Sequence, residues 1–146
     1  MAVGELLPKI VEGPIGPEAI VIDAIAAGAI DLWSPVIIVA PGTGEDLARV
    51  ATVAGANSVL CVGVIVGPIK ASGKAADVAG DKVNLCTFGR CKVKVAAALT
   101  VGAMFATSAT AGKAGAATPA IGAVIGKLLA ASGADGDIVP CFVDAA

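Results

Sequence analysis

The stretch that decides the fold runs from 82 to 95 and reads KVNLCTFGRCKVKV. Apolar and polar residues alternate on both sides of Gly89, which is typical of antiparallel strands that bury one face. The residues that this alternation directs toward a core are Val83, Leu85, Val93 and Val95. The lysines and Asn84 lie at the intervening positions, so we expect them to face solvent.

The four residues Thr87-Phe88-Gly89-Arg90 separate the two alternating halves. A tight turn that uses Gly89 would join strands at 82–87 and 90–96 into a hairpin. Such a hairpin would bring Cys86 and Cys91 near each other across the turn.

The rest of the chain repeats the scheme of short apolar segments separated by turn residues, which is typical of an all-β sandwich or barrel. Further strands are predicted at 19–25, 35–40, 48–54, 59–66, 103–107, 123–131 and 138–143. Glycine with Asn, Asp or Ser marks the intervening turns. A helix over 114–131 is weakened by Pro119, Gly122 and Gly126, so a loop and a strand are favoured there. We predict an all-β fold with at most a minor α contribution, a small antiparallel β-barrel or sandwich.

A chain of 146 residues is long enough for one ordinary domain. We assign 19–146 to a single β-rich domain and 1–18 to an extended N-terminal arm, because prolines and glycines break any continuous element in that segment. A disordered terminus is the alternative. The apolar side chains that equip the arm to contact a capsid or another subunit are Leu6, Leu7, Ile10, Val11 and Ile15.

The charges argue against several classes of function. Ten basic and twelve acidic residues are scattered along the chain, without the basic stripe that nucleic-acid binding needs. The chain contains no histidine, so the usual Ser-His and Cys-His nucleophile arrangements cannot form within it. We therefore predict neither an enzyme nor a cofactor-binding protein, and no nucleic-acid partner.

Membrane insertion is a further class to consider, because 50–69 and 95–112 carry no charge. Their length would admit a spanning helix. The first run, however, contains glycines, Asn57, Ser58 and Pro68 around a β-branched centre, so no membrane span is predicted. The N-terminus lacks the basic and apolar regions of a secretory signal, which indicates synthesis in the cytoplasm.

The four cysteines have three interpretations: buried thiols, a disulfide between Cys86 and Cys91, or a metal site. Only these two are close in sequence, and zinc sites favour closer pairs, so no metal is predicted. Cys61 and Cys141 lie within apolar strands, where a free thiol packs as a small hydrophobe.

Two Gly-rich stretches are read as turns. The segment 42–45 lacks the Lys-Ser/Thr of a phosphate loop. Asp135 and Asp137 lack the further oxygen ligands of a calcium loop.

Trp33 is the single tryptophan and precedes an apolar strand. It either plugs one end of the core or anchors a subunit interface, where tryptophan is enriched.

The order of motifs from residue 19 onward resembles the decoration, or cement, proteins of tailed-phage capsids. The shared pattern consists of a Pro-Val-Ile-Ile-Val segment at 35–39, an apolar segment at 60–65, a Gly-Asp turn before a strand at 79–83 and a Gly-centred turn at 89. It continues with apolar segments at 98–105 and 125–129 and a Gly-Asp turn before the final strand at 136–143.

This resemblance implies a viral structural protein that binds the outside of an assembled capsid and bridges capsomers. Its implied partners are the major capsid protein and further copies of itself, with a trimer favoured, and its implied location is the capsid exterior of the virion after synthesis in the host cytoplasm. The alternative is a self-assembling fibre, pilus or surface-layer subunit. A third hypothesis, an enzyme or small-ligand binder, would require a polar pocket.

Overall fold

The computed structural model describes residues 19–118 and 124–144. The predicted arm, 1–18, lies outside the described residues. Within them the structure has strands and no helix, which confirms the all-β prediction. The strands are β1 (Ile20–Ala26), β2 (Pro35–Val39), β3 (Arg49–Ala51), β4 (Cys61–Gly67), β5 (Lys82–Lys94), β6 (Met104–Thr107), β7 (Ala114–Ala116), β8 (Gly126–Leu128) and β9 (Ile138–Asp144). The described part of the chain therefore offers no helix capable of crossing a bilayer.

The predicted hairpin at Gly89 is wrong, because β5 is one continuous strand of 13 residues. Gly89 adopts φ 110° within that strand. Its neighbours Phe88 and Arg90 both pair with β9, so the chain gains more backbone pairing by continuing than by turning back. Glycine here permits a close approach, since a Cβ at this position would meet the backbone of Ala19.

The predicted segment 123–131 forms only the short strand β8 among its described residues. The described part of 114–131 contains no helix, in line with the loop and strand that the sequence favoured, but 114–116 forms β7, a strand that the sequence did not indicate. This strand reads Ala-Gly-Ala and offers little side-chain signal of its own.

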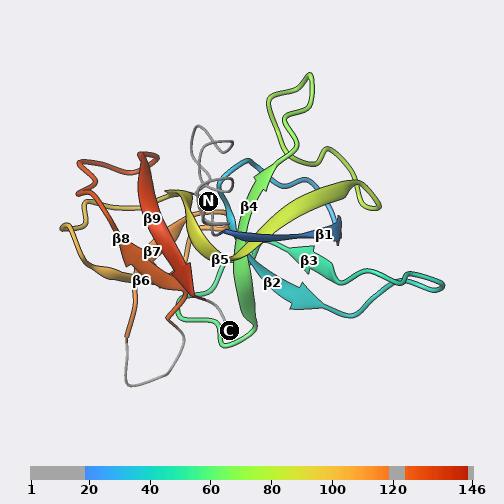
Figure 1. The fold of residues 1–146 in the computed structure, drawn as a ribbon, viewed down its shortest axis with the longest axis horizontal. Coiled ribbons are helices and arrows are strands. Elements are labelled where there is room, and N and C mark those ends of the chain that lie inside the picture. The colour runs from blue at the N-terminus through green and yellow to red at the C-terminus, as the bar shows by residue number, and fades with distance from the viewer. Residues whose placement is uncertain (1–18, 119–123, 145–146) are drawn as a thin grey trace, which may run out of the picture.

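Strands β1 to β4 and the first half of β5 form a closed five-stranded barrel, which we call the N-terminal unit. Around it the order is β1-β3-β2-β4-β5, and β5 pairs back to β1 to close the ring. All contacts between its strands are antiparallel except β1 with β3. Figure 1 shows β5 between this unit and the strands β6 to β9 on its other side.

The second half of β5 with β6 to β9 repeats the same pattern, and we call it the C-terminal unit. Here β6 pairs with β7 and β8, and β9 pairs with β8 and β5, all antiparallel. One parallel bridge from Val95 to Ala114 completes the ring, at the place where β1 pairs in parallel with β3 in the first unit. Each strand of one unit thus has a counterpart in the other, and β5 serves both.

The correspondence extends to individual hydrogen bonds in the turn before the closing strand of each unit. Asp81 Oδ2 accepts the backbone N–H groups of Asp77 and Val78, at 2.8 and 3.2 Å. Asp137 Oδ2 accepts those of Gly133 and Ala134, at 2.7 and 3.0 Å. In both turns the aspartate follows a glycine with positive φ.

The turns that lead into β2 and β6 also match. Trp33 donates its backbone N–H to the carbonyl of Ile65 at 2.8 Å, and Gly102 donates to Leu128 at the same distance. Both donors have positive φ, 65° and 79°. A tryptophan in this conformation is uncommon, because only glycine adopts it without steric cost.

A bulge in β5 separates two hydrophobic cores. Ile20 lies opposite Phe88 but Val21 lies opposite Cys86, so Thr87 is passed over in the pairing with β1. Before the bulge, Val83 and Leu85 face the core of the N-terminal unit. The residues that face the second core are Cys86, Cys91 and Val93 of β5, followed by Val95 just after the end of the strand. The residues at alternate positions up to Leu85 thus face the N-terminal core, and those from Cys91 onward face the C-terminal core.

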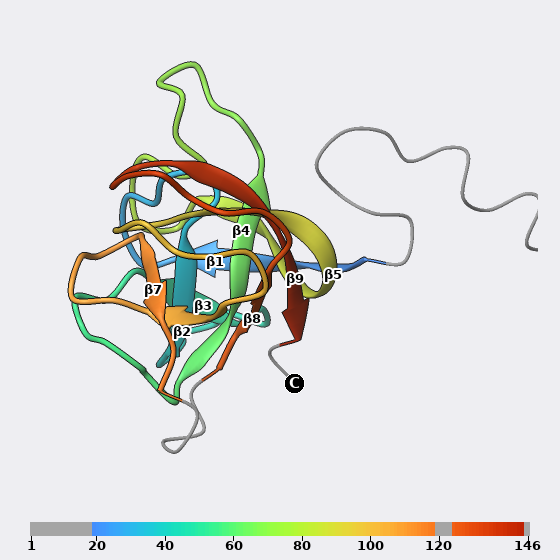
Figure 2. The same cartoon turned by 90° about the vertical axis from the view of Figure 1, so that its left-hand side faces the viewer.

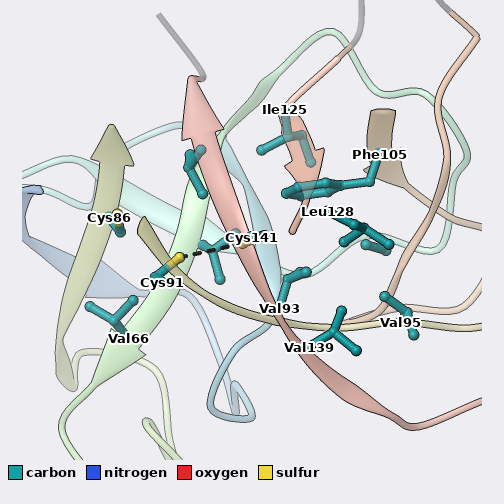
Figure 3. Packing of buried hydrophobic residues seen from close by; sticks show 13 residues of the cluster. Val66, Cys86, Cys91, Val93, Val95, Phe105, Ile125, Leu128, Val139 and Cys141 are labelled. Carbon is teal, nitrogen blue, oxygen red and sulfur yellow. Dashed lines mark hydrogen bonds between the residues drawn. The ribbon is translucent and has the colours of Figure 1, made fainter. Parts of the chain in front are cut away.

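The second core also includes the outer surface of the N-terminal unit. Val64 and Val66 of β4 and Cys86 of β5 are buried together with residues of the C-terminal unit such as Phe105 and Leu128. Figure 3 shows Val66 and Cys86 beside Cys91 at the edge of this cluster. One unit therefore packs its interior against the outside of the other.

Gly126 marks the closest approach of β8 to β9. A Cβ at this position would collide with the carbonyl oxygen of Phe142, and a Cβ at the corresponding Gly63 would collide with that of Cys86. We expect Gly126→Ala to lower the free energy of unfolding by about 1–3 kcal/mol, because the sheet must move apart. Urea denaturation would measure this.

The matched control is Gly28→Ala, where no atom lies within 4 Å of the added methyl group. We expect it to change stability by less than about 0.5 kcal/mol. Equal effects of the two substitutions would contradict the described β8–β9 packing.

Candidate interaction surface

The outer face of the C-terminal unit carries an uncovered apolar hollow at β8 and β9. Its volume is about 400 Å³, and its lining is Val124, Gly126, Lys127, Leu129, Phe142 and Asp144. Leu129 is 47% exposed and Phe142 is 36% exposed. We call Val124, Leu129 and Phe142, with Lys127 between them, the β8–β9 face. Exposed side chains of this size in one place indicate a contact surface.

A second exposed apolar group lies at the beginning of β1. Ile20, Val21 and Ile22 are all exposed, although strands of a small barrel usually bury alternate residues. We call these three residues the β1 start. Phe88 packs edge-to-face against Phe142 of the β8–β9 face, with ring centroids 5.1 Å apart.

Both groups meet at Phe88 of β5. It is the pairing partner of Ile20 from β1 and of Asp144 from β9. Figure 2 shows the beginning of β1 and the end of β9 on the same side of the molecule, near the bent β5. The exposed apolar surface thus extends across β1, β5 and β9.

Trp33 lies away from this surface, in a more polar hollow of about 360 Å³. The residues around it are Asp31, Leu32, Ser72, Gly73, Lys74, Lys94 and Ile138. Asp31 and Lys94 form an ion pair there at 3.8 Å. Trp33 is partly buried and packs against the core of the C-terminal unit, and its carbonyl accepts the N–H of Lys94 at 2.9 Å. It therefore connects the two units.

All four cysteines are free thiols. The structure therefore has no disulfide between Cys86 and Cys91, which the sequence left open beside buried thiols and a metal site. Cys91 instead lies opposite Cys141, with the two sulfur atoms 3.7 Å apart (Figure 3). The Cys91 thiol, and in second place burial, raises the pKa of Cys86 far above its ordinary value. Burial raises the pKa of Cys61 to about 11.

These thiols should react slowly while the protein is folded. A pKa of about 11 leaves roughly one Cys61 side chain in a thousand ionised at pH 8, against about a quarter for an ordinary thiol. We expect native alkylation by iodoacetamide to be more than about a hundredfold slower than in urea. Mass spectrometry would count the modified cysteines, and rapid labelling of Cys91 or Cys141 in the folded chain would contradict their burial.

Asp81 and Asp137, the aspartates of the two Gly-Asp turns, each accept two hydrogen bonds from backbone N–H groups. Asp137 accepts two N–H groups of its own turn, as expected for a turn and not for a calcium loop. No group of three metal-binding side chains occurs within 19–118 and 124–144. The backbone hydrogen bonds from Asp77 and Val78, followed by the charge of Lys70, lower the pKa of Asp81 below its ordinary value of 3.8.

The lowered pKa of Asp81 makes stability depend on pH. The ionised carboxylate stabilises the fold above pH 3.8, and this contribution is lost as pH falls through the lower pKa of the folded state. We expect Asp81→Asn to reduce stability at pH 7 and to flatten its decline in acid. Thermal unfolding from pH 7 to 2 would measure both, with the exposed loop substitution Asp46→Asn as the control.

The sequence prediction and the structure overlap only in part. The structure brings Cys86 and Cys91 close together and places Trp33 between the units. The apolar residues predicted for contact in the arm, from Leu6 to Ile15, lie outside the described residues. Leu129, Phe142 and Ile22 were missed, because apolar residues occupy both faces of their strands and only the fold shows which face is covered.

Comparisons with known proteins identify a similar fold. No protein-family model matches the chain, and no curated protein matches it in sequence. The crystal structure of the N base of head fiber gp8.5 in bacteriophage phi29 is similar, with a TM-score of 0.55 and 16% sequence identity. The match covers 88% of this chain and 96% of that chain. At this level of identity the similarity shows a shared fold.

Proposed function

We propose that this chain is a non-enzymatic structural protein of a tailed phage that binds the outer surface of the assembled capsid. In this role it joins the major capsid protein on the virion exterior, assembles as a homotrimer and stabilises the head by bridging capsomers. The observation that carries the proposal is the similarity of nearly the whole fold to a protein of a phage head fiber.

The surface of the described residues supports a binding role over catalysis. The 400 Å³ hollow at the β8–β9 face exposes mainly apolar surface, and the aspartates of the Gly-Asp turns accept hydrogen bonds from their own backbone. Many identical copies on a symmetric shell need only modest contacts each, because avidity multiplies them. A small apolar patch on each copy is sufficient for that purpose.

The apolar arm residues are the proposed capsid contacts, with Trp33 as a further one. An arm can add its backbone to a neighbouring sheet edge while the folded part packs against the shell. The five side chains concerned are Leu6, Leu7, Ile10, Val11 and Ile15. Trp33 is held by both units, so it would present a fixed edge to a partner.

The test is sedimentation of the protein with capsids of the encoding virus assembled without it. We expect saturable binding with a fixed number of copies per capsid, and capsids that resist heat better once they are occupied. Replacing the five arm side chains by serine should weaken binding at least about tenfold. The control replaces five exposed residues of the folded part by serine: Val59, Leu60, Ile69, Val78 and Val101.

Two results would contradict the proposal at different levels. Failure of the wild-type protein to bind capsids would overturn the function itself. Equal binding by the arm variant and the wild type would leave capsid binding intact and overturn the role of the arm.

The alternative is a subunit of a self-assembling fibre, pilus or surface layer. The observation that favours it is that the similar structure belongs to a head fiber. Such a subunit should form open-ended polymers without capsids, whereas a decoration protein should stay a small closed oligomer. Light scattering after size exclusion distinguishes the two.

A further inference from the structure

The repeated architecture gives each surface of one unit a counterpart in the other. In the N-terminal unit, Val64 of β4 lies opposite Cys86 of β5. In the C-terminal unit, Lys127 of β8 lies opposite Phe142 of β9. Both pairs sit next to the glycine that brings the two strands close, Gly63 or Gly126, so they occupy the same place in the pattern.

The face around Val64 and Cys86 is covered within the molecule. Val64 and Cys86 are fully buried and Val66 is 8% exposed, because the C-terminal unit packs over them. Cys61 at the beginning of β4 packs against the same core. The outside of β4 is thus part of a contact between the two units beyond the shared strand.

The corresponding face of the C-terminal unit is the β8–β9 face, and nothing among the described residues covers it. Phe142 is the counterpart of Cys86 in the first unit. Leu128 is the counterpart of Ile65, so Leu129, the next residue, is the counterpart of Val66. Val124 precedes Gly126 by two positions, as Cys61 precedes Gly63. Lys127, Leu129 and Phe142, which line the 400 Å³ hollow, are therefore the counterparts of Val64, Val66 and Cys86, which the second unit buries.

The other half of this contact is also exposed, on the N-terminal unit. Within the chain, Cys86 is met by Cys91, which pairs with Cys141 of β9. The counterpart of that pair in the first unit is Ile22 with Leu85 of β5. Cys91 is 1% exposed and Ile22 is 43% exposed. Among residues 19–118 and 124–144, both halves of this internal contact thus have an exposed counterpart.

We propose that the β8–β9 face of one copy binds the β1 start of a second copy, in a contact that imitates the packing of the C-terminal unit on the N-terminal unit. Phe142 and Leu129 of one copy would be covered by Ile22 and Ile20 of the next. This inference deepens the self-association of the proposed function, and it does not depend on capsid binding.

The position of the two halves favours a closed ring. A contact between unlike surfaces continues into a fibre or closes into a ring, depending on the rotation between copies. Here the two surfaces flank one residue, Phe88, and do not lie at opposite ends of the molecule. Successive copies therefore turn sharply toward one axis, as a trimer requires.

The test uses two single variants of the full chain, Leu129→Asp and Ile22→Asp, studied by sedimentation velocity without capsids. Each removes one half of the contact, so each alone should associate at least about tenfold more weakly than the wild type. Mixed in equal amounts, they should form a one-to-one dimer, because the mixture contains one intact copy of each half. Two carboxylates oppose each other at the remaining contact, so the ring cannot close.

The matched controls are Val101→Asp and Ile69→Asp, which place the same charge on residues 66% and 72% exposed outside both surfaces. They should associate like the wild type, and thermal unfolding should show all four variants folded. A wild-type chain that stays monomeric would overturn the inference. So would folded Asp variants that associate normally, or a mixture that forms no dimer. Loss of capsid binding with the ring intact would instead count against the proposed function alone.

Discussion

Strand β5 has to bury one face in its first half and the other face in its second half. Leu85 fills the N-terminal core, whereas Cys86 on the opposite face and then Cys91 both fill the C-terminal core. A regular strand cannot direct Cys86 and Cys91 to the same side, because residues five positions apart lie on opposite faces. The bulge at Thr87 supplies the change of face, and Gly89 supplies the space, since a side chain there would meet Ala19. The strands of both units depend on this change of face, because β5 pairs with β1 and β4 in one unit and with β9 in the other.

The change of face also explains why the molecule has two cores of different composition. The N-terminal core includes four alanines, Ala24, Ala26, Ala75 and Ala76, beside larger residues such as Ile65 and Leu85. The C-terminal core contains Phe105 and, in addition, the outer side of β4. It can be larger because the first unit serves as one of its walls. Free thiols suit the crowded junction, where Cys86, Cys91 and Cys141 pack as small hydrophobes.

The sequence was sufficient to predict the type of fold and most strands, because alternation and Gly-rich turns are local signals. The buried faces of Val83, Leu85, Val93 and Val95 were predicted correctly. The hairpin at Gly89 was wrong, since glycine marks a turn and a bulge equally well in sequence and only the partner strands decide between them. Strand β7 was missed because Ala114-Gly115-Ala116 has no side-chain pattern.

The repetition of the two units was not predicted from the sequence. Both units contain Gly-Asp-x-Val, at 80–83 and 136–139, but a match of this length is also expected of two unrelated turns. The β8–β9 face could not be predicted for a related reason. Its residues are apolar like those of the core, and only the packing of the described strands shows which of them are exposed.

Sharing β5 also determines how the molecule can unfold. In most repeat proteins each unit contributes complete strands or helices, so a terminal unit can detach while the others remain folded. Here the closing strand of one unit is the opening strand of the next, and the outside of one is a wall of the other's core. Detaching either unit would expose both cores at once. The duplicated chain is therefore one cooperative folding unit, in which local opening is confined to the loops and the short edge strands.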